Sequence, residues 1–149
     1  MFRKILVPTD GSALSEHAAA AAVALARGSG AEIVALSVAQ QWDPTHAQFD
    51  DDTAAAQRER ALNAAAQRAG RVARLAQDAG VPHSLVTAIA SSQHDEIIRV
   101  ALELHCDLIF LAAHGQCGVT RLIAGRVPQL VLAYSPVPVI LYRGSGEAA

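Results

Sequence analysis

At 149 residues the chain is long enough to close one hydrophobic core, and we expect residues 1–149 to form a single domain. Hydrophobic residues make up 52% of it but aromatic residues only 4%, so the core must consist mainly of alanine, valine, leucine and isoleucine. A net charge of −2 argues against a nucleic-acid-binding surface, and the apolar runs are too short to cross a membrane. Two cysteines cannot make a disulfide framework, and no secretion signal precedes the first strand-like run, so we expect a cytoplasmic protein.

Short apolar runs rich in β-branched residues alternate with longer helical patterns along the chain. The apolar runs predict five strands, at Lys4–Pro8, Glu32–Ala39, Ser84–Ile89, Leu108–Ala112 and Val137–Tyr142. The patterns between them predict four helices: one capped by Ser12 and ended by Gly28 or Gly30, one over Thr53–Ala79, one capped by Ser92, and one over Arg126–Tyr134. This alternation requires right-handed crossovers, so we predict an α/β fold with a five-stranded parallel sheet and helices on both faces. The fourth run is apolar on both sides and is predicted to lie inside the sheet.

Ligands bind to sheets of this kind outside the carboxyl ends of the strands. Here that edge is predicted to consist of Pro8–Ser12, Val38–Gln41 and Ala112–Gly125. The one long connection, Gln40–Asp52, is compatible with a lid over the edge and with a plain mobile loop, which is the commoner case for a loop of this length. The sequence leaves these two alternatives open.

Three glycines follow the fourth predicted strand. Gly115 and Gly118 come first, and Gly125 directly precedes the last predicted helix. Glycines let backbone N–H groups approach a phosphate closely, and a helix N-terminus adds partial positive charge. The same spacing is also typical of tight turns that bind nothing. Spacing alone does not choose between an anion site and plain turns.

Several of these motifs occur together and in order. The chain opens with ILVPTDGS and closes with SPVPVILYR, and it has His-Gly after the fourth strand and Gly125 after a nine-residue spacer. In this combination it resembles the universal stress protein family over nearly its whole length. The resemblance implies a Rossmann-like sheet in the order 3-2-1-4-5, a homodimer, and a regulatory role in the stress response. In nucleotide-binding members the phosphates lie on a motif of G-x-x-G, a nine-residue spacer, and G-Ser/Thr, while base and ribose lie against the first two strand ends.

Carried over position by position, this motif is incomplete. Ala112 stands where the first motif glycine would be, Gly115 and Gly125 are retained, and Arg126 replaces the hydroxyl residue that would meet the phosphates. The nucleotide-binding residues that the resemblance implies, together with their neighbours in the glycine-rich crossover, are Pro8, Thr9, Asp10, Val38, Ala112, His114, Gly115, Gly118, Gly125, Arg126 and Val127.

Arg126 leads to two hypotheses of function. As a phosphate ligand, its guanidinium would form a charge-assisted bidentate pair and favour mono- or diphosphates over ATP, in a nucleotide-responsive regulatory module. Folded into the site, it would occupy the phosphate slot and leave a nucleotide-free dimeric scaffold whose protein partner the sequence does not name. The cofactor expected under the first hypothesis is an adenine nucleotide (ATP, ADP or AMP), with Mg²⁺ only in its company.

Other polar residues near this edge have local alternatives. Asp10 can accept hydrogen bonds from a ribose, but an aspartate before Gly-Ser also commonly forms a turn with its own backbone. His114 can donate to a phosphate or fix the turn in which it lies. Cys117 is either a redox-sensitive thiol or a small side chain that fills space.

Sequence signatures of enzymes and of metal sites are absent. No G-x-G-x-x-G follows the first strand, and neither G-x-x-x-x-G-K-[ST] nor G-x-S-x-G occurs. No pair of carboxylates accompanies the glycines, so we predict a protein without catalytic residues, although slow ATP hydrolysis stays open. His105 and Cys106 are separated from His114 and Cys117 by a strand, so the four cannot share a metal ion.

The last predicted strand bears on self-association. Its prolines are tolerated at the edge of a sheet and not at its centre, so it should be an edge strand. An apolar edge favours pairing with its symmetry mate. We therefore predict a homodimer through this strand, with contacts from Val137, Val139, Ile140 and Leu141.

Overall fold

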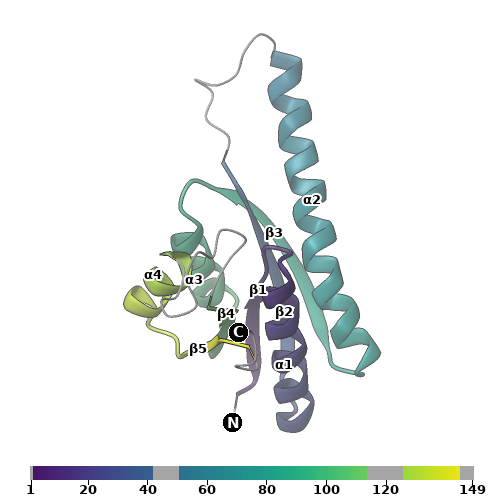
Figure 1. The fold of residues 1–149 in the computed structure, drawn as a ribbon, viewed down its shortest axis with the longest axis vertical. Helices are drawn as coiled ribbons and strands as arrows, with labels where there is room; N and C mark the ends of the chain where they lie inside the picture. The colour runs from purple at the N-terminus through teal and green to yellow at the C-terminus, as the bar shows by residue number, and fades with distance from the viewer. Residues whose placement is uncertain (1, 42–50, 114–125, 145–149) are drawn as a thin grey trace.

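The computed structural model describes residues 2–41, 51–113 and 126–144, and these form one α/β unit (Figure 1). The strands are β1 (Lys4–Pro8), β2 (Glu32–Gln40), β3 (His83–Ala90), β4 (Leu108–Ala112) and β5 (Val139–Tyr142). The helices are α1 (Ala13–Ser29), α2 (Asp51–Asp78), α3 (Gln93–Glu103) and α4 (Arg126–Tyr134). The predicted alternation of strands and helices is thus confirmed, with most boundaries within two residues.

All strand pairs in the sheet are parallel, in the order β3-β2-β1-β4-β5. This confirms the predicted order and the internal position of β4, in which every residue is buried. The order means that the chain winds outward from β1 through β2 to β3, and then crosses back to β4 and β5. The winding therefore reverses between β1 and β4.

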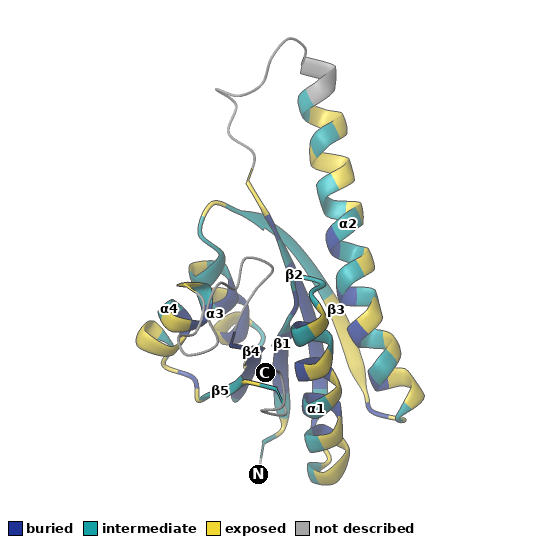
Figure 2. Ribbon diagram, viewed as in Figure 1, coloured by how far each residue is buried: buried dark blue, intermediate teal, exposed yellow. Residues whose placement is uncertain are grey.

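Helices cover both faces of the sheet, and each face has its own core (Figure 2). On one face α1 and α2 pack on alternate strand residues such as Ile5 and Ile33, mostly through alanines. On the other face α3 and α4 pack on the intervening residues such as Leu6 and Val34. The scarcity of aromatic residues suits this arrangement, because alanine faces allow helices to approach the sheet closely.

Both ends of α1 follow from local sequence. The Ser12 side chain accepts a hydrogen bond from the Ser15 backbone N–H, which caps the first turn. Gly30 adopts a left-handed conformation with φ of 74° and ends the helix. Of the two glycines predicted to end this helix, Gly28 therefore lies inside it.

Only part of α2 packs on the sheet. Its buried residues are Ala65, Ala69, Val72 and Ala76, all in the carboxyl-terminal half. The amino-terminal half extends beyond the carboxyl edge of the sheet (Figure 1). The helix begins at Asp51, two residues before the predicted start.

β5 begins at Val139, and the predicted start at Val137 was wrong. The Ser135 hydroxyl donates to the Val137 carbonyl at 2.7 Å and accepts from the Val137 N–H at 3.0 Å, so this segment is a turn. Val137 is 9% exposed and belongs to the core under α3 and α4. A buried core residue in the protomer is not available to a dimer contact.

The beginnings of β1 and β4 are joined by a carboxylate. Asp107 accepts hydrogen bonds from the backbone N–H groups of Arg3 (2.8 Å to Oδ2) and Lys4 (3.0 Å to Oδ1). Desolvation alone would raise the pKa of Asp107, but these backbone hydrogen bonds outweigh it and lower the pKa below its ordinary value. The charged carboxylate thus aligns the two strands at the edge opposite the candidate site.

Within the part of the chain that the structure describes, no helix is both long enough and apolar enough to cross a membrane.

Candidate functional site

The reversal of winding places the ends of β1 and β4 next to each other. β1 pairs with β4 in the register Leu6 to Ile109, and both strands end two or three residues later, at Pro8 and Ala112. Thr9 and Asp10 follow β1 at the same edge of the sheet. The predicted site residues Pro8, Thr9, Asp10 and Ala112 are therefore brought together at the sheet edge where parallel sheets bind ligands.

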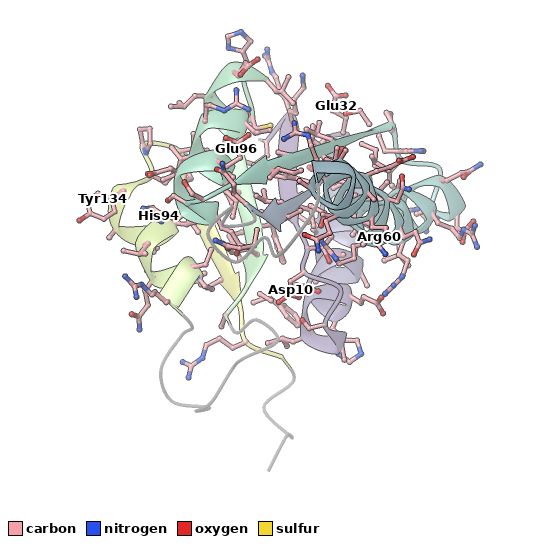
Figure 3. All side chains as sticks on the ribbon, turned by 90° about the horizontal axis from the view of Figure 1, so that it is seen from above. Asp10, Glu32, Arg60, His94, Glu96 and Tyr134 are labelled. Carbon is pink, nitrogen blue, oxygen red and sulfur yellow. The ribbon has the colours of Figure 1, made fainter. Side chains whose placement is uncertain are left out.

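The turn after β1 is tied down by hydrogen bonds. The buried Thr9 donates its N–H to the Leu36 carbonyl at 2.8 Å, and its hydroxyl accepts from the Gly11 N–H at 3.1 Å. Asp10 Oδ1 accepts from the Ser12 N–H at 2.9 Å, so the aspartate does form the local turn considered above. Gly11 has φ of 81°, which only glycine adopts without strain. The turn is thus held in one conformation, with Asp10 at the start of α1 (Figure 3).

Two further residues, which were not predicted from the sequence, hold this turn through hydrogen bonds on the β2 and α2 side. The buried Ser37 hydroxyl of β2 donates to the Thr9 carbonyl at 3.1 Å. Arg68 of α2 in turn donates its Nε–H to the Ser37 Oγ at 3.0 Å. For Ser37, the sequence offered one indication of such a role, a serine inside an otherwise apolar strand. The arginine could not be recognised, because it is one of five in α2 and only packing distinguishes it.

A pocket of about 350 Å³ opens at the same edge, on the α3/α4 side of the sheet. It lies between the end of β2 and the first turns of α3 and α4. Its lining residues are Gln40, Ser91, Ser92, Gln93, His94, Arg126, Val127 and Leu130. Two predicted site residues, Arg126 and Val127, are among them, and the Arg126 side chain is exposed.

Polar groups dominate the α3 side of this pocket. Ser92 occupies the cap position of α3, as predicted, but its side chain makes no capping hydrogen bond. Its hydroxyl instead pairs with His94 Nδ1 at 3.2 Å. The first N–H groups of α3 therefore have no side-chain cap and contribute partial positive charge beside the pocket. Figure 3 shows His94 beside Tyr134 of α4, with ring centroids 6.1 Å apart.

The remaining predicted positions divide into two groups. Val38, half-buried, packs against the α3/α4 core, and the buried Ala112 belongs to the α1/α2 core. His114, Gly115, Gly118 and Gly125 lie outside the described residues, as do Cys117 and most of the Gln40–Asp52 connection.

Neither thiol chemistry nor metal binding is evident in the described ranges. Cys106 is buried, and burial raises the pKa of its thiol to about 11, so the thiol stays protonated at neutral pH. Within residues 2–41, 51–113 and 126–144, no three histidine, cysteine or acidic side chains are grouped as a metal site would require.

Comparison with known proteins places this geometry in context. The model of the Universal stress protein family matches residues 1–143. The chain belongs to the universal stress protein family. A curated relative, the universal stress protein in the QAH/OAS sulfhydrylase 3′ region of Thermus aquaticus, is 31% identical over 144 residues, covering 96% of this chain and all of the relative.

Solved structures show the same fold as this universal stress protein. The hypothetical protein MJ0577 superimposes with a TM-score of 0.83 at 22% identity, over 95% of this chain and 96% of that one. A universal stress protein in complex with cAMP has a TM-score of 0.67 at 19% identity, with 94% and 96% covered. The universal stress protein from Archaeoglobus fulgidus in complex with dAMP has a TM-score of 0.58 at 19% identity, with 93% and 96% covered.

Proposed function

We propose that this universal stress protein binds an adenine nucleotide at the carboxyl edge of its sheet and acts as a cytoplasmic, dimeric regulatory module in the stress response. The observation that carries the proposal is the pocket at the first turns of α3 and α4, which contains Arg126 and opens at the same sheet edge as Asp10. Two solved relatives in complex with cAMP and dAMP support the class of ligand.

The two ends of the proposed ligand follow from charge. The start of α4 has a partial positive charge, and Arg126 adds a full one, so the phosphate belongs there. Asp10, which follows β1, is an acceptor for ribose hydroxyls, as acidic residues in dinucleotide sites are. Arg126 is exposed and lines the pocket, which favours phosphate binding over the alternative of a scaffold whose slot this side chain fills.

We further propose that the protein is not an enzyme. Glu96, in the first turn of α3, is engaged by Arg99 through hydrogen bonds and charge, which lower its pKa despite desolvation. A carboxylate held in its charged form is a weak proton acceptor. Mg²⁺ would enter only with a polyphosphate.

Calorimetry on protein stripped of ligand tests this function. We expect heat of binding with AMP, ADP and ATP, and a loss of about tenfold or more in AMP affinity for Arg126→Ala, because a charge-assisted phosphate pair is removed. Arg27→Ala is the control, since this exposed arginine lies in the last turn of α1, at the end of the helix opposite to Asp10.

Absence of binding heat for every nucleotide, with none extracted from the purified protein, would refute the proposal. ATP binding that appears only in Arg126→Ser would instead support the scaffold alternative.

A further inference from the structure

The Arg68 side chain lies against the turn that carries Asp10, the residue proposed above to meet the ribose. The side chain leaves α2 at the carboxyl edge, and its Cδ lies so close to Gly11 that a Cβ on the glycine would be 2.8 Å away. Its Nε–H donates to Ser37 Oγ at 3.0 Å, and Ser37 is itself buried and bonded to the Thr9 carbonyl. Two independent contacts therefore fix the half-buried arginine beside the turn that carries Asp10.

The terminal nitrogens of this guanidinium make no hydrogen bond to another described residue. Among the described residues, Arg68 donates to Ser37, and it does so through its Nε–H. Arg71, one turn along α2, differs in this respect, because its Nη1 lies 2.7 Å from Glu16 Oε1. Arg68 has no such carboxylate partner in the described part of the chain. A positioned cation whose forked donors are not used is suited to bind a bidentate anion.

The position of Arg68 indicates which part of a nucleotide it would meet. In the proposed orientation the 5′-phosphate is at α4, and the ribose hydroxyls are at Asp10. Arg68 lies next to Gly11, the residue after Asp10, and contacts Ser37, which is in phase with the β2 residues of the α1/α2 core. In dinucleotide sites, an arginine beside the ribose-binding acid is the group that accommodates a phosphate on the ribose.

We propose that Arg68 is a specificity-determining residue that binds an anionic group on the 2′- or 3′-oxygen of the bound ribose. The inference rests on the proposed function and extends it, because it selects nucleotides with a second, ribose-linked phosphate over simple 5′-monophosphates. Both forms of this ligand contain a phosphate ester on the ribose. Probes with the ester on the 2′- or on the 3′-oxygen distinguish them.

The test compares AMP with adenosine 2′,5′- and 3′,5′-bisphosphate by calorimetry. We expect wild type to bind one bisphosphate about tenfold more tightly than AMP, as one added charge-assisted pair allows. In Arg68→Gln this ratio should fall to about one, and Arg68→Lys, with charge but no fork, should lie between. Arg74→Gln is the matched control, an exposed arginine of the same helix, and should keep the wild-type ratio.

Comparing two ligands on each variant separates recognition from support of the turn. If Arg68 only holds the turn, both affinities fall together in Arg68→Gln and the ratio is unchanged, which would overturn the inference. A wild-type ratio of one would overturn it as well, while AMP binding would leave the proposed function standing. If wild type binds neither AMP nor the bisphosphates, the proposed function itself has failed.

Discussion

The conformation of single residues sets the shape of the turn after β1. The sequence left two alternatives for Asp10, a turn residue and a ribose ligand, and the structure shows the turn: one carboxylate oxygen accepts from the Ser12 N–H. The two roles are compatible, because a carboxylate has several lone pairs. Two features favour glycine at position 11: its φ of 81°, and the Arg68 side chain, whose Cδ would lie 2.8 Å from an added Cβ.

Gly11→Ala should lower the free energy of unfolding by about 1–2 kcal/mol, because a Cβ is strained at positive φ and also displaces Arg68. Gly70→Ala is the matched control. Gly70 lies inside α2 with open space around it and should become more stable by about 0.5–1 kcal/mol. Urea unfolding of both variants measures the difference, and equal stability of the two would show that the turn tolerates a side chain.

At the scale of elements, residue patterns and packing contribute differently. Short continuous apolar runs predicted every strand, because strands of a parallel sheet that is covered on both faces are apolar throughout. The errors are at ends that long-range or turn contacts define. β5 begins late because Ser135 forms a turn around Val137, and β2 runs on to Gln40, in register with Ala90 of β3.

Asp107→Asn should weaken the connection between β1 and β4. At pH 7 we expect the free energy of unfolding to fall by about 1 kcal/mol, because charge-assisted hydrogen bonds to two backbone N–H groups become neutral ones. The folded-state pKa of Asp107 is lowered, so its contribution is full above the unfolded pKa of about 4 and is lost as pH falls through the folded value.

The measurement is urea unfolding of wild type and Asp107→Asn from neutral pH down to about pH 3. The difference between them should shrink as the pH falls below about 4. Asp78→Asn, at the exposed end of α2, removes the same charge and should cost little. A difference that stays constant with pH would show that the ionised carboxylate is not what joins the strands.

At the scale of the whole molecule, β5 is an edge strand of the sheet, as the sequence predicted. The side chains of Val139 and Leu141 pack on the α3/α4 core, and that of Ile140 packs on the other core, so all three are partly buried in the protomer. The Pro138 carbonyl accepts a hydrogen bond from Ile109 of β4, and the Tyr142 carbonyl accepts one from Ala113, directly after β4. Because successive strand residues alternate in direction, the backbone groups of Val139 and Leu141 point away from β4. A second copy would meet backbone more than side chains.

We predict that Val139→Pro yields monomers where wild type forms dimers. Proline removes an outward N–H at the edge but leaves the inward pairing with β4 and most of the side-chain volume. Light scattering should give the 15.5 kDa mass of one chain for the variant and twice that mass for wild type. Val139→Thr, which keeps the N–H, is the control. A dimeric Val139→Pro variant would place the interface elsewhere.

The sequence by itself determined the fold class, the strand order through its family motifs, and the strand ends where a ligand would be bound, because burial and turn chemistry are local and periodic. It also indicated Arg126 and Val127, which do line a pocket. Only the tertiary structure decided that Ser37 and Arg68 belong beside the turn that carries Asp10, and that Val137 is core. Those contacts join segments tens of residues apart, and their partners are chosen by how helices and strands pack rather than by any pattern along the chain.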